Sequence, residues 1–204
     1  MAKGIILESS SLSSLILETD KTQVTRHLHV FETRGLSNYF FNFLTQSEKN
    51  FSFIGVGIGP GAYTGVRVSI TIAKSLAYAL NIPIVCFSSL ESFVPEKDGK
   101  FLSIIDAKIG GVYACKAERS NQEVRFSKPS LFSIQDINLI LKDTPRVISP
   151  DLEAVKKRID PNFNIEWTLG MPNEQELARL CFSRFSKKNF VTIDDLKPIY
   201  LRDA

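Results

Sequence analysis

The segment from Gly59 to Arg67, which reads Gly-Pro-Gly-Ala-Tyr-Thr-Gly-Val-Arg, places the strongest constraint on how this chain can fold. An apolar run over 51–58 precedes it, and an apolar pattern at helical spacing over 66–80 follows it. The glycines therefore fall where a buried strand turns into a helix. Glycine lets the backbone adopt positive φ and lets another group approach closely. Such a turn suits an anion or the backbone of a partner.

Residue types within the turn favour an anion. The N-terminus of the following helix supplies unpaired N–H groups, Arg67 adds a cation in the first turn, and the Thr64 hydroxyl is expected to cap the helix. The candidate anion- or nucleotide-binding residues are Gly59, Gly61, Thr64, Gly65 and Arg67. The pattern lacks the Gly-Lys-Ser/Thr of a Walker loop and is one residue longer than the dinucleotide fingerprint. A purely structural role for the turn stays open.

Hydrophobic periodicity predicts an α/β chain of two lobes. The first half is expected to form strands at 5–7, 15–17, 24–30, 51–58 and 84–87, with helices at 36–44, 66–80 and from Ser88. A similar rhythm follows, with strands at 101–105, 112–117, 123–126 and 147–148, and helices at 133–141, from 151 and at 174–185. Mixed sheets with flanking helices, in lobes 1–98 and 99–204, account for this order.

The two helices of the first half carry more apolar surface than one sheet can cover. Apolar residues occupy more than half the circumference of helix 66–80, leaving a polar stripe at Arg67, Thr71, Lys74 and Tyr78, and Phe41 points away from the apolar face of helix 36–44. The helices either pack on each other or face another subunit. The second interpretation gives these partner-facing residues: Leu36, Tyr39, Phe40, Phe43, Val68, Ile72 and Leu76.

Composition excludes several classes of function. The formal net charge is only +3, too small for a strong nucleic-acid-binding surface, so we expect any RNA contact to be shared with a partner. Three widely spaced cysteines favour a reducing, cytoplasmic location, and no apolar run is long enough for a signal peptide or a membrane span. The only two histidines, His27 and His29, alternate on a strand without carboxylates or cysteines at ligand spacing, so we predict no metal site.

A longer ordered string carries a family resemblance. From Ile54 to Ser92 the chain resembles the TsaB (YeaZ) family, glycoprotease-like subunits that support synthesis of threonylcarbamoyladenosine on tRNA. The resemblance includes the glycine turn, the stretch 73–77 and Ser-Ser-Leu-Glu at 88–91, with weaker matches at 106–108, 112–113 and 198–202. It implies an actin-like, sugar-kinase-like (ASKHA) fold of two related lobes.

The resemblance also implies a role without independent catalysis. Such subunits pair through the two helices of the N-terminal lobe with a TsaD-like catalytic subunit, which transfers threonylcarbamoyl to the adenosine 3′ of the anticodon, and a TsaE-like ATPase joins them. The same helices suit a homodimer when the partner is absent. No cofactor is assigned to this chain itself, and ATP or ADP at the partner interface is left as an alternative.

Departures from the family pattern define the competing hypothesis. The chain has Glu8-Ser9-Ser10 where the family has Asp-Thr-Ser, and the stretch 33–39 contains no histidine. The alternative function is an ATP-dependent phosphotransferase or ATPase of the same fold, with Glu8 as general base or magnesium partner and the glycine turn on the phosphates. The absence of a second clear phosphate loop in the C-terminal half argues against it.

Overall fold

The computed structural model describes residues 2–31, 35–48, 50–121, 123–144, 146–159 and 164–201. Residues 33 and 34 and Arg202, which entered the family comparison above, lie outside these ranges. The chain divides into two compact units, each described by itself: unit 1 holds the residues up to Ser92 together with Pro172–Ile199, and unit 2 holds Phe93–Met171 with the stretch from Tyr200 on.

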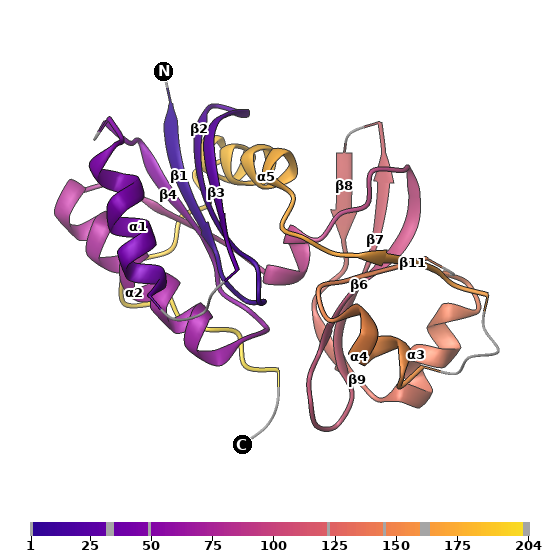
Figure 1. Ribbon diagram of the computed structural model, residues 1–204. Helices are drawn as coiled ribbons and strands as arrows, with labels where there is room; N and C mark the ends of the chain where they lie inside the picture. The colour runs from indigo at the N-terminus through magenta and orange to yellow at the C-terminus, as the bar shows by residue number, and fades with distance from the viewer. Residues whose placement is uncertain are drawn as a thin grey trace. The chain divides into compact units, whose positions relative to one another are not determined.

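Unit 1 is built on a five-stranded mixed sheet (Figure 1). Its strands are β1 (Lys3–Glu8), β2 (Ser14–Asp20), β3 (Gln23–Val30), β4 (Phe53–Gly57) and β5 (Ile84–Phe87), in the order β3-β2-β1-β4-β5. The first three strands are antiparallel neighbours, whereas β4 runs parallel to both β1 and β5. The five strands predicted for the first half are confirmed.

Helices cover both faces of this sheet. Figure 1 shows α1 (Leu36–Thr45) and α2 (Tyr63–Leu80) on one side and α5 (Glu174–Ser186) on the other. Because side chains alternate along a strand, neighbouring residues of β1 serve different layers. Ile5 packs with the α1 and α2 side chains, and Ile6 packs with the α5 side chains. The sheet is therefore buried on both faces, as the apolar runs of its central strands predict.

Unit 2 repeats the same strand topology. Its sheet contains β6 (Gly99–Asp106), β7 (Val112–Ser120), β8 (Glu123–Phe126), β10 (Arg146–Ser149) and β11 (Glu166–Leu169), in the order β11-β10-β6-β7-β8. A three-strand antiparallel meander followed by two parallel strands describes both sheets. The remaining elements are β9 (Ser130–Phe132), which pairs with β7, and the helices α3 (Ile134–Leu141) and α4 (Leu152–Lys156). This duplication confirms the expected fold of two related lobes.

Several element predictions need correction. The helix expected from Ser88 is only a 3-10 turn, η1 (Ser89–Ser92), and α2 begins at Tyr63 rather than Val66. The strands β9 and β11 were not predicted, because three or four residues with mixed polarity carry little periodic signal. In the described ranges, no helix combines the length and the apolar character needed to cross a membrane.

The predicted lobe boundary also differs from the observed division. The chain leaves unit 1 after Ser92 rather than at residue 98, and it returns to unit 1 at Pro172, so α5 does not belong to the second lobe. The reason is burial: Leu177 and Cys181 of α5 are fully buried against the apolar side chains of the first sheet. Leu196, further along, joins the core on the opposite face of that sheet.

Candidate functional site: the glycine turn and the helix pair

The glycine turn links β4 to α2 as predicted. Gly59 has φ +90° and Gly61 has φ +150°, and the peptide bond between Gly59 and Pro60 is cis. The N-cap of α2 is Ala62, and no side chain caps it. The predicted cap at Thr64 is therefore wrong, because Thr64 already lies inside the first turn of the helix.

The group that approaches the glycines closely is the chain's own backbone. A Cβ added to Gly61 or Gly65 would lie less than 3.0 Å from the carbonyl oxygen of Ser10 or Ser9, respectively. The Ala62 N–H donates to Ser10 O at 2.7 Å, and Ser9 Oγ donates to Gly65 O at 2.7 Å. The loop between β1 and β2 thus occupies this side of the turn. The geometry supports the structural role that the sequence left open for the turn, because the close contact is with the chain's own backbone.

Glu8 connects three segments next to the glycine turn: the end of β1, the loop that follows it and η1. Its carboxylate accepts from the Ser10 N–H at 2.7 Å and from Ser89 Oγ at 2.9 Å, and Ser89 N–H donates to Gly59 O at 2.9 Å. A Cβ on Gly57 would collide with the carboxylate, so glycine there leaves room for it. Glu8 is only 1% exposed, and burial raises its pKa, although the hydrogen bonds from Ser10 and Ser89 partly offset that rise.

This environment does not favour the catalytic hypothesis for Glu8. A general base must come within hydrogen-bond reach of its substrate. Both oxygens of Glu8 already accept hydrogen bonds from the protein, and the side chain is closed off from solvent. The geometry instead makes Glu8 a buried tie between β1, the loop that follows it and η1.

Six of the seven predicted interface residues fall into two groups. Leu36, Phe40 and Phe43 of α1 are buried in the core of unit 1, where they share one cluster with the apolar side chains of α2. The prediction that these three residues face a partner is wrong. The two helices pack over the same sheet, and these side chains are buried in the core between them and the sheet. Val68, Ile72 and Leu76 are half-buried. Ile72 and Leu76 also pack against that core.

Exposed aromatic side chains remain on both helices. Tyr39 is 38% exposed and Phe41 65% on α1, while Tyr63 is 61% and Tyr78 82% exposed on α2. The Arg67 guanidinium lies 3.9 Å from the centre of the Tyr63 ring. We define these four aromatic residues with Arg67 as the aromatic face.

The α2 members of the aromatic face lie along the stripe of that helix that the sequence marks as polar. Tyr63, Arg67, Thr71, Lys74 and Tyr78 recur every three or four residues and so share one side of α2. The predicted interface residues did not include Tyr63, and Tyr78 was counted only as polar, although a tyrosine is largely apolar in contact area. The two tyrosines in that stripe were the sequence signal that could have indicated exposed apolar surface there.

The two histidines have a carboxylate partner that the sequence did not reveal. Glu174 of α5 lies within 4 Å of both His27 and His29, although it is distant in sequence. Within the described part of the chain, no group of three or more His, Cys, Asp or Glu side chains has the arrangement of a metal site.

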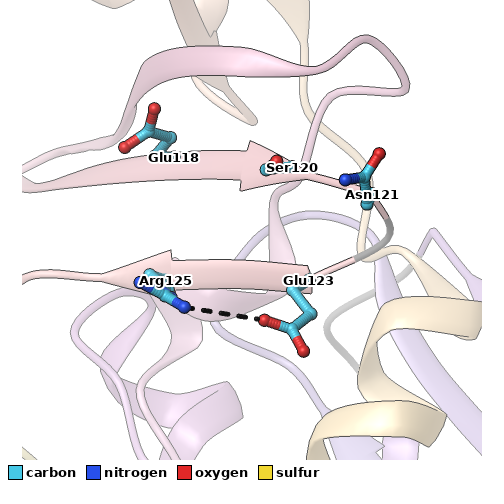
Figure 2. A pocket seen from close by; sticks show the side chains of 5 residues that line it. All are labelled: Glu118, Ser120, Asn121, Glu123 and Arg125. Atoms are coloured by element: carbon cyan, nitrogen blue, oxygen red, sulfur yellow. Dashed lines mark ion pairs between the residues drawn. The ribbon is translucent and has the colours of Figure 1, made fainter.

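A surface recess belongs to unit 2 and is lined by none of these residues. Figure 2 shows its side chains coming from both strands of the β7–β8 hairpin and from the turn that joins them. They are Glu118, Ser120, Asn121, Glu123 and Arg125, all of them polar and exposed. Glu123 and Arg125 form an ion pair at 3.8 Å. Ligand pockets are mostly apolar and enclosing, so this recess lacks the character of a small-molecule site.

Comparison with known proteins identifies the family. Residues 27–139 match the family model described as TsaD, tRNA N6-adenosine threonylcarbamoyltransferase. The tRNA threonylcarbamoyladenosine biosynthesis protein TsaB of Bacillus subtilis is 44% identical over 170 residues, covering 78% of this chain and 72% of that protein. The TsaB of Buchnera aphidicola subsp. Schizaphis graminum is 29% identical over 154 residues, covering 71% and 73%.

A solved structure agrees in fold. YeaZ from Pseudomonas aeruginosa superposes with a TM-score of 0.80 at 18% identity, covering 98% of this chain and 100% of that one. The actin-like, sugar-kinase-like fold expected from the resemblance is confirmed by this match and by the duplicated sheet topology. The chain belongs to the TsaB family of tRNA threonylcarbamoyladenosine biosynthesis proteins.

Proposed function

We propose that this chain is a non-catalytic partner and activator subunit in the formation of N6-threonylcarbamoyladenosine next to the anticodon of tRNA. It docks a TsaD-like catalytic subunit through the aromatic face of α1 and α2, and a TsaE-like ATPase joins the assembly. Family membership supports the pathway, since the relatives named above are tRNA threonylcarbamoyladenosine biosynthesis proteins. Contact with tRNA is made through the complex, in keeping with the small net charge.

The exposure of the aromatic face is the observation that carries this proposal. Tyrosine, phenylalanine and arginine are enriched at protein interfaces and at the positions where truncation costs most binding energy. Tyr78 is 82% exposed although both helices are otherwise packed on their sheet. The buried residues of α1 and α2 fix the backbone, so the aromatic face is presented by a rigid element, which lowers the entropic cost of binding.

Two observations support the non-catalytic role: the burial of Glu8 and the contact of the glycine turn with the chain's own backbone. The carboxylate is buried with its oxygens occupied, and the β1–β2 loop lies against Gly61 and Gly65. Glu8 and the glycine turn, which the alternative ATPase would need for catalysis and phosphate binding, therefore make internal contacts that stabilise unit 1. A nucleotide bound where this chain meets its partner stays compatible with the proposal, because Arg67 and Thr64 are exposed.

The central experiment compares two aspartate variants. Tyr78→Asp places a charge on the aromatic face, and Leu139→Asp makes the same kind of change at an exposed apolar position of α3, in unit 2. Each variant is mixed with the organism's own TsaD-like subunit and run on size exclusion, and tRNA modification is measured after adding the TsaE-like ATPase. We expect Tyr78→Asp to weaken binding at least tenfold, since hot-spot residues contribute about 2 kcal/mol or more.

Leu139→Asp should co-elute and activate like the wild type. Equal thermal unfolding of the two variants would show that neither has lost its fold. Normal binding and activation by Tyr78→Asp, Phe41→Asp and Tyr63→Asp would contradict the proposed docking face. ATP turnover by the isolated wild type that disappears in Glu8→Gln would favour the ATPase instead. The chain alone is expected to form a homodimer that Tyr78→Asp dissociates, because the same face then has no other partner.

A further inference from the structure

We propose that His27, His29 and Glu174 form a proton-dependent clasp, which fastens the first turn of α5 to the edge strand β3 more tightly at pH 6 than at pH 8. This inference is independent of the proposed function. It rests on the convergence of the chain's only two imidazoles on one carboxylate from a distant helix.

The geometry brings both rings to the same oxygen. His29 Nε2 lies 2.7 Å from Glu174 Oε1, and His27 Nε2 lies 3.9 Å from that oxygen. The two residues are two apart on β3, so their side chains point to the same face of the sheet. Their ring centres are 5.9 Å apart in an edge-on arrangement.

His29 can be satisfied in either protonation state. In the neutral ring, Nε2–H donates to Glu174, and Nδ1 lies 3.4 Å from Ser13 Oγ, whose hydroxyl can donate to it. A hydroxyl both donates and accepts, so after Nδ1 takes up a proton the same Ser13 oxygen becomes its acceptor. Protonation therefore adds an attraction to the carboxylate and leaves no ring nitrogen without a partner.

Glu174 is set up to stay ionised. It lies in the first turn of α5, where the helix dipole favours a negative charge. Partial burial on its own raises the pKa of Glu174, but the hydrogen bond from His29 and the charges of both rings outweigh it, and the net pKa is lowered. A carboxylate that remains charged attracts a protonated imidazole more strongly than a neutral one.

The groups around the two rings offer no ionic contact, among the described residues, that competes with Glu174. For the described residues, the ionic contacts recorded for the two rings are with Glu174, from α5. From the loop before β2 comes the uncharged Ser13, and from the end of β3 comes the ring of Phe31, stacked on His29. Two protonated rings repel each other, so the gain comes mainly from the closer and more buried ring, that of His29.

A neighbouring hydrogen bond supplies a matched control. Gln175 Nε2 donates to Thr22 O at 2.7 Å and so ties the same turn of α5 to the loop between β2 and β3. This bond contains no titrating group. Gln175→Ala should therefore loosen α5 by the same factor at both pH values, whereas His29→Gln should remove the pH response itself.

The test measures hydrogen exchange at the Leu177 and Ala178 amides, one turn into α5, as protection factors at pH 6 and pH 8. We expect protection in the wild type to rise about fivefold at the lower pH, the effect of one partly buried ion pair. His29→Gln should show less than half of that rise, and Glu174→Gln, which keeps size and polarity, should behave in the same way. Comparing each variant with the wild type at each pH removes contributions from Glu8 and other distant groups.

Two results would overturn the clasp. One is wild-type protection that stays equal or falls at pH 6, which would mean that repulsion between the rings prevails. The other is a fivefold rise that persists in both His29→Gln and Glu174→Gln, since the response would then arise elsewhere.

Discussion

At the residue scale, the packing of Gly65 against Ser9 determines the role of the glycine turn. Gly65 occupies the third position of α2, where an alanine would ordinarily be the better helix former by about 1 kcal/mol. Ser9 O lies where the Cβ of an alanine would be placed, and Ser9 Oγ donates to the Gly65 carbonyl. Gly65 is thus required by a neighbour from the loop between β1 and β2 rather than by its own helix.

Gly65→Ala tests this interpretation because two effects have opposite signs. Helix propensity alone predicts stabilisation, whereas overpacking against Ser9 costs about 1 to 3 kcal/mol. We expect a net loss of about 1 kcal/mol in the free energy of unfolding by urea. Ser75→Ala, at an exposed position of the same helix, should be neutral or slightly stabilising. A stabilised Gly65→Ala would show that the loop moves away without cost.

Individual elements are held by local signals that the sequence displays openly. The helix α3 is capped at its N-terminus by Ser133, whose hydroxyl accepts from the Asp136 N–H at 3.1 Å and donates to the Asp136 carboxylate at 2.7 Å. This is the N-terminal cap expected of serine before an apolar pattern. The helix packs through Ile137 and Leu141 on the second sheet, so its cap matters to unit 2 as a whole.

Ser133→Ala should lower the stability of unit 2 by about 1 kcal/mol, because an N–H at the helix start loses its acceptor. Urea unfolding followed by circular dichroism would measure the loss. Gln135→Ala, an exposed change in the same turn, should stay within about 0.5 kcal/mol of the wild type. Equal effects of the two variants would contradict the capping role.

At the scale of the whole molecule, the duplicated topology places two carboxylates at equivalent positions. Glu8 ends β1 and Asp106 ends β6, and each accepts the N–H of the residue two positions on, at 2.7 and 2.9 Å. Their surroundings differ: Glu8 has serine partners, whereas Asp106 is paired with Lys108 and Arg158. Burial raises the pKa of Asp106 as well, but the hydrogen bonds and charges from Lys108 and Arg158 outweigh it and lower that pKa.

The two carboxylates should therefore give stability with opposite pH dependence. The contribution of Glu8, with its pKa raised on folding, is complete below its unfolded value and is lost as pH rises through the folded one. The contribution of Asp106, with its pKa lowered, is present above its unfolded value and is lost as pH falls through the folded one. At pH 8, Asp106→Asn should cost about 2 kcal/mol, while Glu8→Gln should match or exceed the wild type.

Urea unfolding at pH 3 and pH 8 would test both variants, since pH 3 lies below the ordinary pKa of both carboxyl groups. The deficit of Asp106→Asn should shrink at pH 3, and so should any advantage of Glu8→Gln. Parallel pH trends in the two variants would show that the equivalent carboxylates share one environment after all.

The sequence by itself determined the elements and the family. Period-two and helical apolar patterns marked the strands β1 to β8 and the long helices, because those segments bury a continuous face. The ordered string around the glycine turn indicated the TsaB family, which the comparisons confirm. Short strands such as β9 and β11 escaped, since a few residues of mixed polarity carry no clear period.

Only the tertiary structure decided which surfaces are free and which groups meet. Periodicity cannot tell an apolar face that covers a sheet from one that awaits a partner, so Phe40 and Phe43 were misassigned while Tyr63 was overlooked. The partners of Gly65 and of His29 lie 56 and 145 residues away in sequence. Contacts over such separations depend on how the strands order in the sheet and on the return of α5 to unit 1, neither of which a local pattern encodes.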